Sequence, residues 1–184
     1  TNQVDFQLNV GDKDVDQVVL VNNAGVIEPV KHLGHTARDA IQSHYNVNLV
    51  SPVVLINNFL QEMGDKPFEK VIINVSSGAA QRPMDGWGCY CSAKAGLDMI
   101  SQVTNLETKM DQIDCRVYSL APGIVDTPMQ DTIRTAEKSE FSRLEDFKNF
   151  KEEGLLVDPN DVAKKFVEVV NNPDLNLNVI DRLN

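Results

Sequence analysis

Short apolar runs that alternate with longer amphipathic stretches constrain the fold of this chain most strongly. The apolar runs lie at residues 18–21, 71–75 and 115–120, and helical periodicity is found at residues 40–63 and 90–109. A run that is apolar at nearly every position suits a strand buried on both faces, as in a parallel sheet covered by helices. The pattern therefore predicts an α/β fold built on a doubly wound parallel sheet.

Each apolar run ends in residues that favour a turn. Asn-Asn-Ala-Gly follows the first run at residues 22–25, Ser-Ser-Gly follows the second at residues 76–78, and Ala-Pro-Gly follows the third at residues 121–123. Ligands of open parallel sheets bind outside the carboxyl ends of the strands. We therefore expect these three loops to converge on one cleft.

The N-terminal part does not contain everything that a dinucleotide-binding fold requires. Such a fold opens with a strand, a glycine-rich turn and a helix whose N-terminus receives the pyrophosphate. No such turn precedes Val18. Residues 6–10 resemble a strand, and residues 11–17 are short for the crossover helix that should follow. The sequence is therefore expected to lack, or not to show, its first βαβ unit.

The C-terminal part predicts a lid, a helix and an edge strand. Apolar residues in a polar stretch are spaced for a helical pair or a lid, at Ile133, Phe141, Leu144, Phe147 and Phe150. We predict a substrate lid at residues 130–157 within a single domain of residues 1–184. Asp158 should cap a helix that runs to about residue 171, and residues 177–180 should form a final edge strand. Pro52 should bend the helix at residues 40–63.

Composition excludes several classes of protein. A formal net charge of -10 and a pI near 4.7 disfavour binding to nucleic acid or to an anionic membrane surface. No apolar run approaches the roughly 20 residues that a membrane-spanning helix needs. The three cysteines lack Cys-x-x-Cys spacing, and the N-terminus lacks the pattern of a signal peptide. These features predict a cytoplasmic protein.

The histidines do not form a metal-ligand pattern in the sequence. His32 and His35 are three residues apart, but a glycine intervenes and no cluster of Cys, Asp or Glu accompanies them. We therefore expect no metal site, and we interpret His32, His35 and His44 as loop or surface residues.

Tyr90 and Lys94 carry the clearest chemical pattern. They stand four residues apart at the start of a predicted helix, so their side chains share one face. A nearby cation favours the phenolate and eases proton transfer from the phenol. Ser77, at the end of the preceding strand, can stabilise charge on a carbonyl oxygen. An exposed helix pair is the alternative reading of Tyr90 and Lys94, and a helix-bending hydrogen bond is the alternative for Asn48.

Four motifs then occur in the order and spacing of the short-chain dehydrogenases/reductases, and the sequence from Val18 onward resembles that family. The motifs are Asn-Asn-Ala-Gly, Ser77, Tyr-x-x-x-Lys and Pro-Gly. The resemblance implies a Rossmann-like fold and a catalytic tetrad. Tyr90 would donate the proton, Ser77 would position the carbonyl, Lys94 would also hold the nicotinamide ribose, and Asn48 would support a proton-relay water. The hydride would come from the cofactor, since no side chain donates one.

Within that family, the stretches at residues 86–99, 121–130 and 151–158 resemble the sepiapterin reductases. The resemblance implies NADP as cofactor and side-chain ketones of a pterin as substrate, the reaction of tetrahydrobiopterin synthesis. It implies cofactor contacts from Asn22, Ala24, Gly25, Lys94, Val125, Asp126, Thr127, Pro128, Met129 and Gln130. It implies substrate contacts from Ser77, Gly78, Tyr90, Gly123 and Asp181, whose carboxylate suits the guanidine-like edge of a pterin. It also implies a homodimer through the helices that contain Asn48 and Tyr90.

Two other functions fit the same residues. One is a reductase of other diketones or aldehydes on the same scaffold. The other is a non-catalytic relative that acts through protein interaction, which the missing glycine-rich turn favours and the intact tetrad disfavours. Asp181 also fits a solvated terminal carboxylate, and Trp87 fits either a pocket wall or simple packing at the start of its helix.

Overall fold

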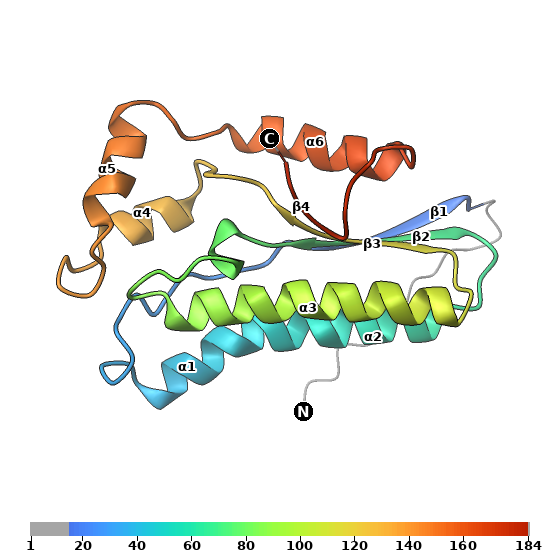
Figure 1. Cartoon of the computed structure of the whole chain (residues 1–184), viewed down its shortest axis with the longest axis horizontal. Helices are drawn as coiled ribbons and strands as arrows, with labels where there is room; N and C mark the ends of the chain where they lie inside the picture. The colour runs from blue at the N-terminus through green and yellow to red at the C-terminus, as the bar shows by residue number, and fades with distance from the viewer. Residues whose placement is uncertain (1–14, 184) are drawn as a thin grey trace.

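The computed structural model describes residues 15–183, and its strands form one parallel sheet (Figure 1). The sheet order is β1-β2-β3-β4, with β1 at Gln17–Asn22, β2 at Glu69–Val75, β3 at Cys115–Ala121 and β4 at Ile180–Arg182. All neighbouring strands pair in parallel. The predicted α/β sheet is thus confirmed, whereas the strand expected at residues 6–10 lies outside the described residues.

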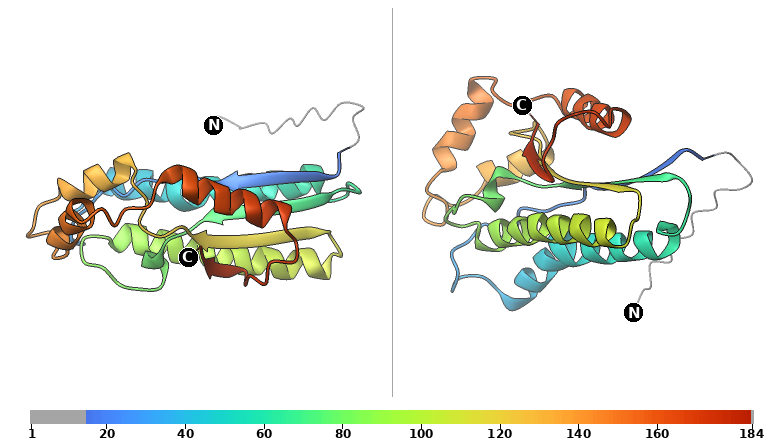
Figure 2. Two further views of the ribbon diagram at one scale, coloured as in Figure 1. Left: turned by 90° about the horizontal axis from the view of Figure 1, so that it is seen from above. Right: turned by 45° about the vertical axis from the view of Figure 1, so that its right-hand side comes forward.

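Helices cover both faces of this sheet, as Figures 1 and 2 show. One face carries α1 (Arg38–Tyr45), α2 (Ser51–Met63) and α3 (Gly88–Met110), and the other carries α6 (Pro159–Asn171). Alternate strand side chains enter two separate cores. Those packed on the α2 face include Leu20, Ile72 and Val117, and those packed on the α6 face include Val71, Ile73, Tyr118 and Leu120. Burial on both faces explains why the strands are continuously apolar.

A helical pair lies beyond the carboxyl ends of the strands. The pair consists of α4 (Pro128–Arg134) and α5 (Leu144–Glu152), and every view places it at that end of the sheet (Figures 1 and 2). Phe141 stacks on Trp87 with ring centroids 5.1 Å apart, and Phe147 meets the same indole edge-on at 5.4 Å. The predicted helical pair is therefore present, and aromatic packing fixes it to the start of α3.

The long helix predicted before β2 is interrupted by a wider turn. Residues Asn46–Val50 form a π-helical turn between α1 and α2. Ser51 and then Pro52 follow this turn, and Pro52 has no N–H to donate to the carbonyl of Asn48, four residues earlier. Ser51 Oγ donates instead to Asn46 O at 2.7 Å. The irregularity expected near Pro52 is therefore real, and it takes the form of a widened turn that contains Asn48.

The last strand is displaced from its predicted position. We expected it at residues 177–180, but β4 spans Ile180–Arg182 and begins where Ile180 pairs with Ser119. Leu175 and Leu177 are apolar because they pack against the α6-side core, and they do not belong to the sheet. The cap on α6 is as predicted, since the Asp158 side chain accepts a hydrogen bond from Asn160 N at 2.7 Å. Among residues 15–183 we find no helix with the length and apolarity that a membrane crossing needs.

Candidate active site

The three loops at the carboxyl ends of β1, β2 and β3 line one cleft of about 1130 Å³, as the sequence predicted. Each loop contributes a small residue to the lining, namely Gly25, Gly78 and Gly123. The helical pair α4–α5, helix α6 and strand β4 complete the walls. This volume is slightly above the usual range of small-molecule sites, about 300–1,000 Å³, so the cleft can hold a large ligand or two smaller ones.

Tyr90 and Ser77 both line this cleft, and their side chains interact. Tyr90 lies in the first turn of α3 and is buried, with 7% of its surface exposed. Burial raises the pKa of the Tyr90 phenol above its ordinary value of 10.0, and a hydrogen bond with the Ser77 side chain opposes this rise. The phenol is therefore protonated at neutral pH, which suits a proton donor better than a base.

Lys94 lies one helical turn further along α3 and is also buried. Its Nζ donates a hydrogen bond to Val75 O at 2.8 Å and lies 5.8 Å from the centroid of the Tyr90 ring. Burial lowers the pKa of Lys94 from 10.5 to about 8, and the nearby Asp98 carboxylate limits that fall. The ammonium is thus close enough to Tyr90 to act on it electrostatically, and it loses its charge within an accessible pH range.

Asp98 is a functional neighbour for which the sequence analysis assigned no role. Its Oδ1 accepts hydrogen bonds from Ser76 Oγ at 2.5 Å and Ser119 Oγ at 2.7 Å, which hold the buried carboxylate beside Lys94. Asp98 follows Lys94 by four residues, so both lie on one face of α3. This spacing is the signal that could have revealed it.

Asn48 is fully buried in the π-helical turn and does not line the cleft. Its side-chain amide binds Val26 twice, accepting from Val26 N at 3.1 Å and donating to Val26 O at 2.9 Å. A side chain at Gly25 would meet Asn48 Oδ1 at 3.1 Å and Lys94 Nζ at 3.6 Å. Asn48 therefore fixes the loop after β1 in contact with Lys94, and glycine at residue 25 permits that close approach.

The surface position expected for His44 was wrong. His44 is only 1% exposed, its Nδ1 donates to Glu28 O at 2.6 Å, and its Nε2 accepts from Asn48 Nδ2 at 3.0 Å. Burial lowers the pKa of His44, which keeps the ring neutral and agrees with this tautomer. The ring also meets Tyr90 edge-on at 6.1 Å. His44 is the buried residue of α1, and its polar side chain gave no sign of this burial in the sequence.

The residues expected to contact the cofactor divide into two groups. Those that line the cleft are Gly25, Lys94, Val125, Thr127, Pro128, Met129 and Gln130. Asn22, Ala24 and Asp126 do not line it. Asn22 Nδ2 donates instead to Asn74 Oδ1 at 2.7 Å, joining β1 to β2, and Asp126 pairs with Lys151 of α5 at 2.8 Å. These contacts stabilise the walls of the cleft.

The residues expected to contact substrate all line the cleft: Ser77, Gly78, Tyr90, Gly123 and Asp181. The Asp181 carboxylate, however, already accepts hydrogen bonds from Asn178 N at 3.0 Å and Arg182 N at 2.8 Å. These hydrogen bonds hold the pKa of Asp181 below its ordinary value. Trp87 both lines the cleft and packs in the aromatic cluster, so both readings of this residue are correct.

Comparison with known proteins places this geometry in a family. The sequence model of the short chain dehydrogenases matches residues 10–138. The chain belongs to the short-chain dehydrogenase family. The crystal structure of the KRED1-Pglu enzyme superposes with a TM-score of 0.77 at 31% identity, over 89% of this chain and 67% of that one.

Two groups of relatives within the short-chain dehydrogenases are informative. A benzil reductase ((S)-benzoin forming) from Bacillus subtilis is 38% identical over 146 residues, which cover 79% of this chain and 60% of the relative. A sepiapterin reductase from Bos taurus is 32% identical over 161 residues, covering 86% and 58%. The chain thus spans about 60% of the length of these relatives. The expected likeness to sepiapterin reductases is present, but the benzil reductase matches at higher identity.

Proposed function

We propose that this short-chain dehydrogenase is a nicotinamide-dependent carbonyl reductase in which Tyr90 supplies the proton. The single observation that supports this most is that Ser77, Tyr90 and Lys94 line one cleft, with Ser77 and Lys94 both next to the Tyr90 side chain. The carbonyl carbon gains a hydride and the carbonyl oxygen gains the Tyr90 proton, so a ketone becomes an alcohol. Ser77 donates a hydrogen bond to the oxygen as negative charge builds on it.

The residues of the cleft fit a nicotinamide cofactor, which supplies the hydride when bound. Gln130 Oε1 is buried and has no hydrogen-bond partner within residues 15–183, although Gln130 lines the cleft. A buried acceptor of this kind costs stability unless a ligand donor satisfies it. Lys94 would hold the ribose hydroxyls with the N–H groups that do not bind Val75 O. We propose NADP over NAD from the likeness to sepiapterin reductases.

We propose a diketone with an apolar or aromatic substituent as the substrate class. The apolar wall of the cleft includes Trp87, Ile133 and Phe147, which suit an aromatic substituent beside the reacting ketone. The higher identity to a benzil reductase supports the same choice. Residues 130–157 would act as the lid over this substrate, since Ile133 and Phe147 belong to that segment.

A pterin side-chain ketone is the second candidate, and Asp181 is the observation that favours it. If the Asp181 carboxylate accepts hydrogen bonds from a pterin, Asp181→Asn should lower kcat/KM for sepiapterin by about 10-fold or more, because it removes a charged hydrogen bond. Turnover of benzil should stay within about twofold, since that molecule lacks the guanidine-like edge. Steady-state kinetics with both substrates measures this difference.

Asp174 is an exposed carboxylate near the same end of the chain, and Asp174→Asn is the matched control. This substitution should leave kcat/KM for both substrates unchanged. A higher kcat/KM for benzil than for sepiapterin supports the diketone proposal. A higher kcat/KM for sepiapterin than for benzil, lost in Asp181→Asn, would support the pterin instead. Absence of turnover with either substrate would contradict both.

We also propose a homodimer through α2 and α3. Large apolar side chains are exposed along one face of α3 at Met99, Val103, Leu106 and Met110, and beside it at Val50 and Val54. An apolar stripe of this kind on two adjacent helices is typical of a subunit interface. Leu106→Glu should therefore convert a dimer to a monomer in light scattering. Val167→Glu, an equally exposed apolar position on α6, should leave the dimer intact, and a monomeric wild type would refute the proposal.

A further inference from the structure

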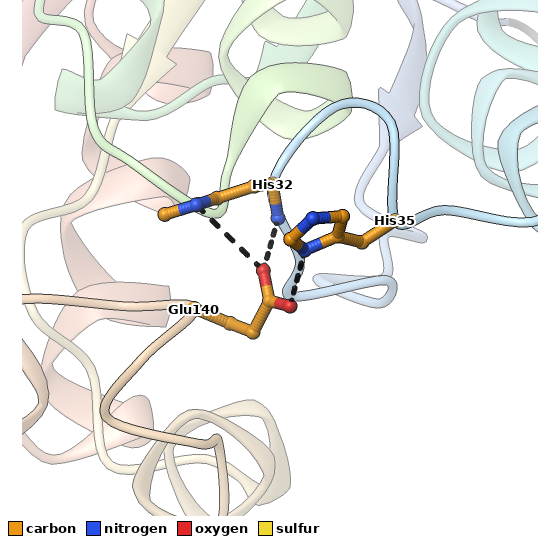
Figure 3. Close-up of side chains that lie close together, drawn as sticks. All are labelled: His32, His35 and Glu140. Carbon is orange, nitrogen blue, oxygen red and sulfur yellow. Dashed lines mark hydrogen bonds and ion pairs between the residues drawn. The ribbon is translucent and has the colours of Figure 1, made fainter.

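Two histidines lie beside a glutamate that is distant from them in sequence (Figure 3), and none of the three residues lines the cleft. His32 and His35 belong to the loop after β1, and Glu140 belongs to the connection between α4 and α5. One candidate ligand atom from each residue lies within 4.8 Å of the other two. The sequence analysis excluded a metal here because no acidic partner stood near the histidines, and the fold supplies that partner.

The distances suit donors to one small cation. Glu140 Oε1 lies 2.7 Å from His35 Nδ1, and Glu140 Oε2 lies 3.9 Å from His32 Nδ1. Donor atoms around a tetrahedral zinc ion are about 3.3 Å apart, given bonds of about 2.0 Å. Small rotations of the side chains would therefore bring all three donors to coordination distance.

A second carboxylate, that of Asp85, lies near the distal nitrogen of His32. His32 Nε2 is buried and has no hydrogen-bond partner within the described residues, and its closest ionic contact is Asp85 Oδ2 at 3.7 Å. Asp85 is itself held by Ser142, which donates from its backbone N at 2.6 Å and from Oγ at 2.8 Å. A carboxylate behind the distal nitrogen of a histidine is the usual outer partner of a metal-binding imidazole.

We propose that His32, His35 and Glu140 bind one divalent transition-metal ion of the zinc class, with water in the remaining position. Two imidazoles and a carboxylate match the preference of zinc for nitrogen and oxygen donors in a three-ligand site. The bound ion joins the loop after β1 to the segment that precedes α5. It thereby clamps the helical pair α4–α5 to the body of the protein, independently of the reaction in the cleft.

Zinc titration of the full-length protein by calorimetry tests this site, with Co²⁺ absorption as a report on coordination. We expect one Zn²⁺ per chain with a Kd of about 10 µM or tighter, and a melting midpoint raised by about 5 °C at saturation. Glu140→Gln and His35→Gln should each weaken binding by at least about tenfold. Glu137→Gln, an exposed glutamate on the same segment, is the matched control and should bind like the wild type.

Absence of Zn²⁺ binding near this affinity would overturn the proposal. Binding that survives both His35→Gln and Glu140→Gln would also overturn it, because the ligands would then lie elsewhere. If Glu140→Gln does not fold, His35→Gln decides the question, since the His35 side chain is 61% exposed and its loss leaves the fold intact.

Discussion

Replacing Tyr90 by phenylalanine should lower kcat by about 10³-fold while leaving the Kd for the nicotinamide cofactor within a factor of about three, as expected for loss of a general acid. The phenol is the group that gives its proton to the carbonyl oxygen, and burial keeps it protonated at neutral pH. Phenylalanine preserves the ring that packs against Trp87 and His44. The loss should therefore appear in turnover and hardly in stability or cofactor binding.

Tyr45→Phe is the matched control for this substitution. The Tyr45 hydroxyl contacts Ser92 Oγ at 2.6 Å, and neither residue lines the cleft. Its turnover should equal that of the wild type. Substantial activity in Tyr90→Phe, measured with benzil and NADPH, would exclude Tyr90 as the proton donor and leave the structure without an acid in that position.

Replacing Lys94 by methionine should abolish turnover and at the same time stabilise the fold by about 1–2 kcal/mol at pH 7. The fall of the Lys94 pKa from 10.5 to about 8 means that charging this buried amine costs about 3 kcal/mol in the folded state. Methionine is similar in length and removes that cost. It also leaves Val75 O without its hydrogen-bond donor, which destabilises the fold by about 1 kcal/mol and reduces the net gain. Chemical denaturation measures the difference.

The pH dependence of this stability difference has a definite sign. Because the folded pKa of Lys94 lies below 10.5, the unfolded chain binds more protons between about pH 8 and pH 10.5. The penalty from Lys94 is therefore complete below pH 8 and disappears as the pH rises to 10.5. The advantage of Lys94→Met should shrink over that interval. Lys109→Met, exposed on the same helix, should show no such gain, and a destabilised Lys94→Met would contradict the account.

The sequence predicted those parts of the fold that local pattern encodes. Apolar runs located β1, β2 and β3, helical periodicity located α3, and the spacing of Tyr90 and Lys94 placed both on one face. The prediction of the last strand failed because the apolar pattern did not coincide with the residues that pair with β3. Leu177 is apolar because it packs against a core, and only the register with Ser119 shows that the last strand starts at Ile180.

The parts of the site that the sequence did not reveal depend on contacts between distant segments. Glu140 stands more than a hundred residues from His35, so their meeting follows from how the α4–α5 connection lies across the loop after β1. His44 is buried between Glu28 of the loop after β1 and Asn48 of the π-helical turn, with which its ring forms hydrogen bonds. Asp98 becomes significant only when β2 and β3 bring Ser76 and Ser119 to its carboxylate.

The proposed chemistry depends on one charged ammonium beside one protonated phenol, and the pH dependence of kcat/KM tests that pair most directly. With the cofactor as the varied substrate, this ratio reports on ionisations in the free enzyme. We expect a plateau near neutral pH and a decline through about pH 8, where Lys94 loses its proton. A profile that stays level up to pH 10 would show that the charge on Lys94 has no part in the reaction.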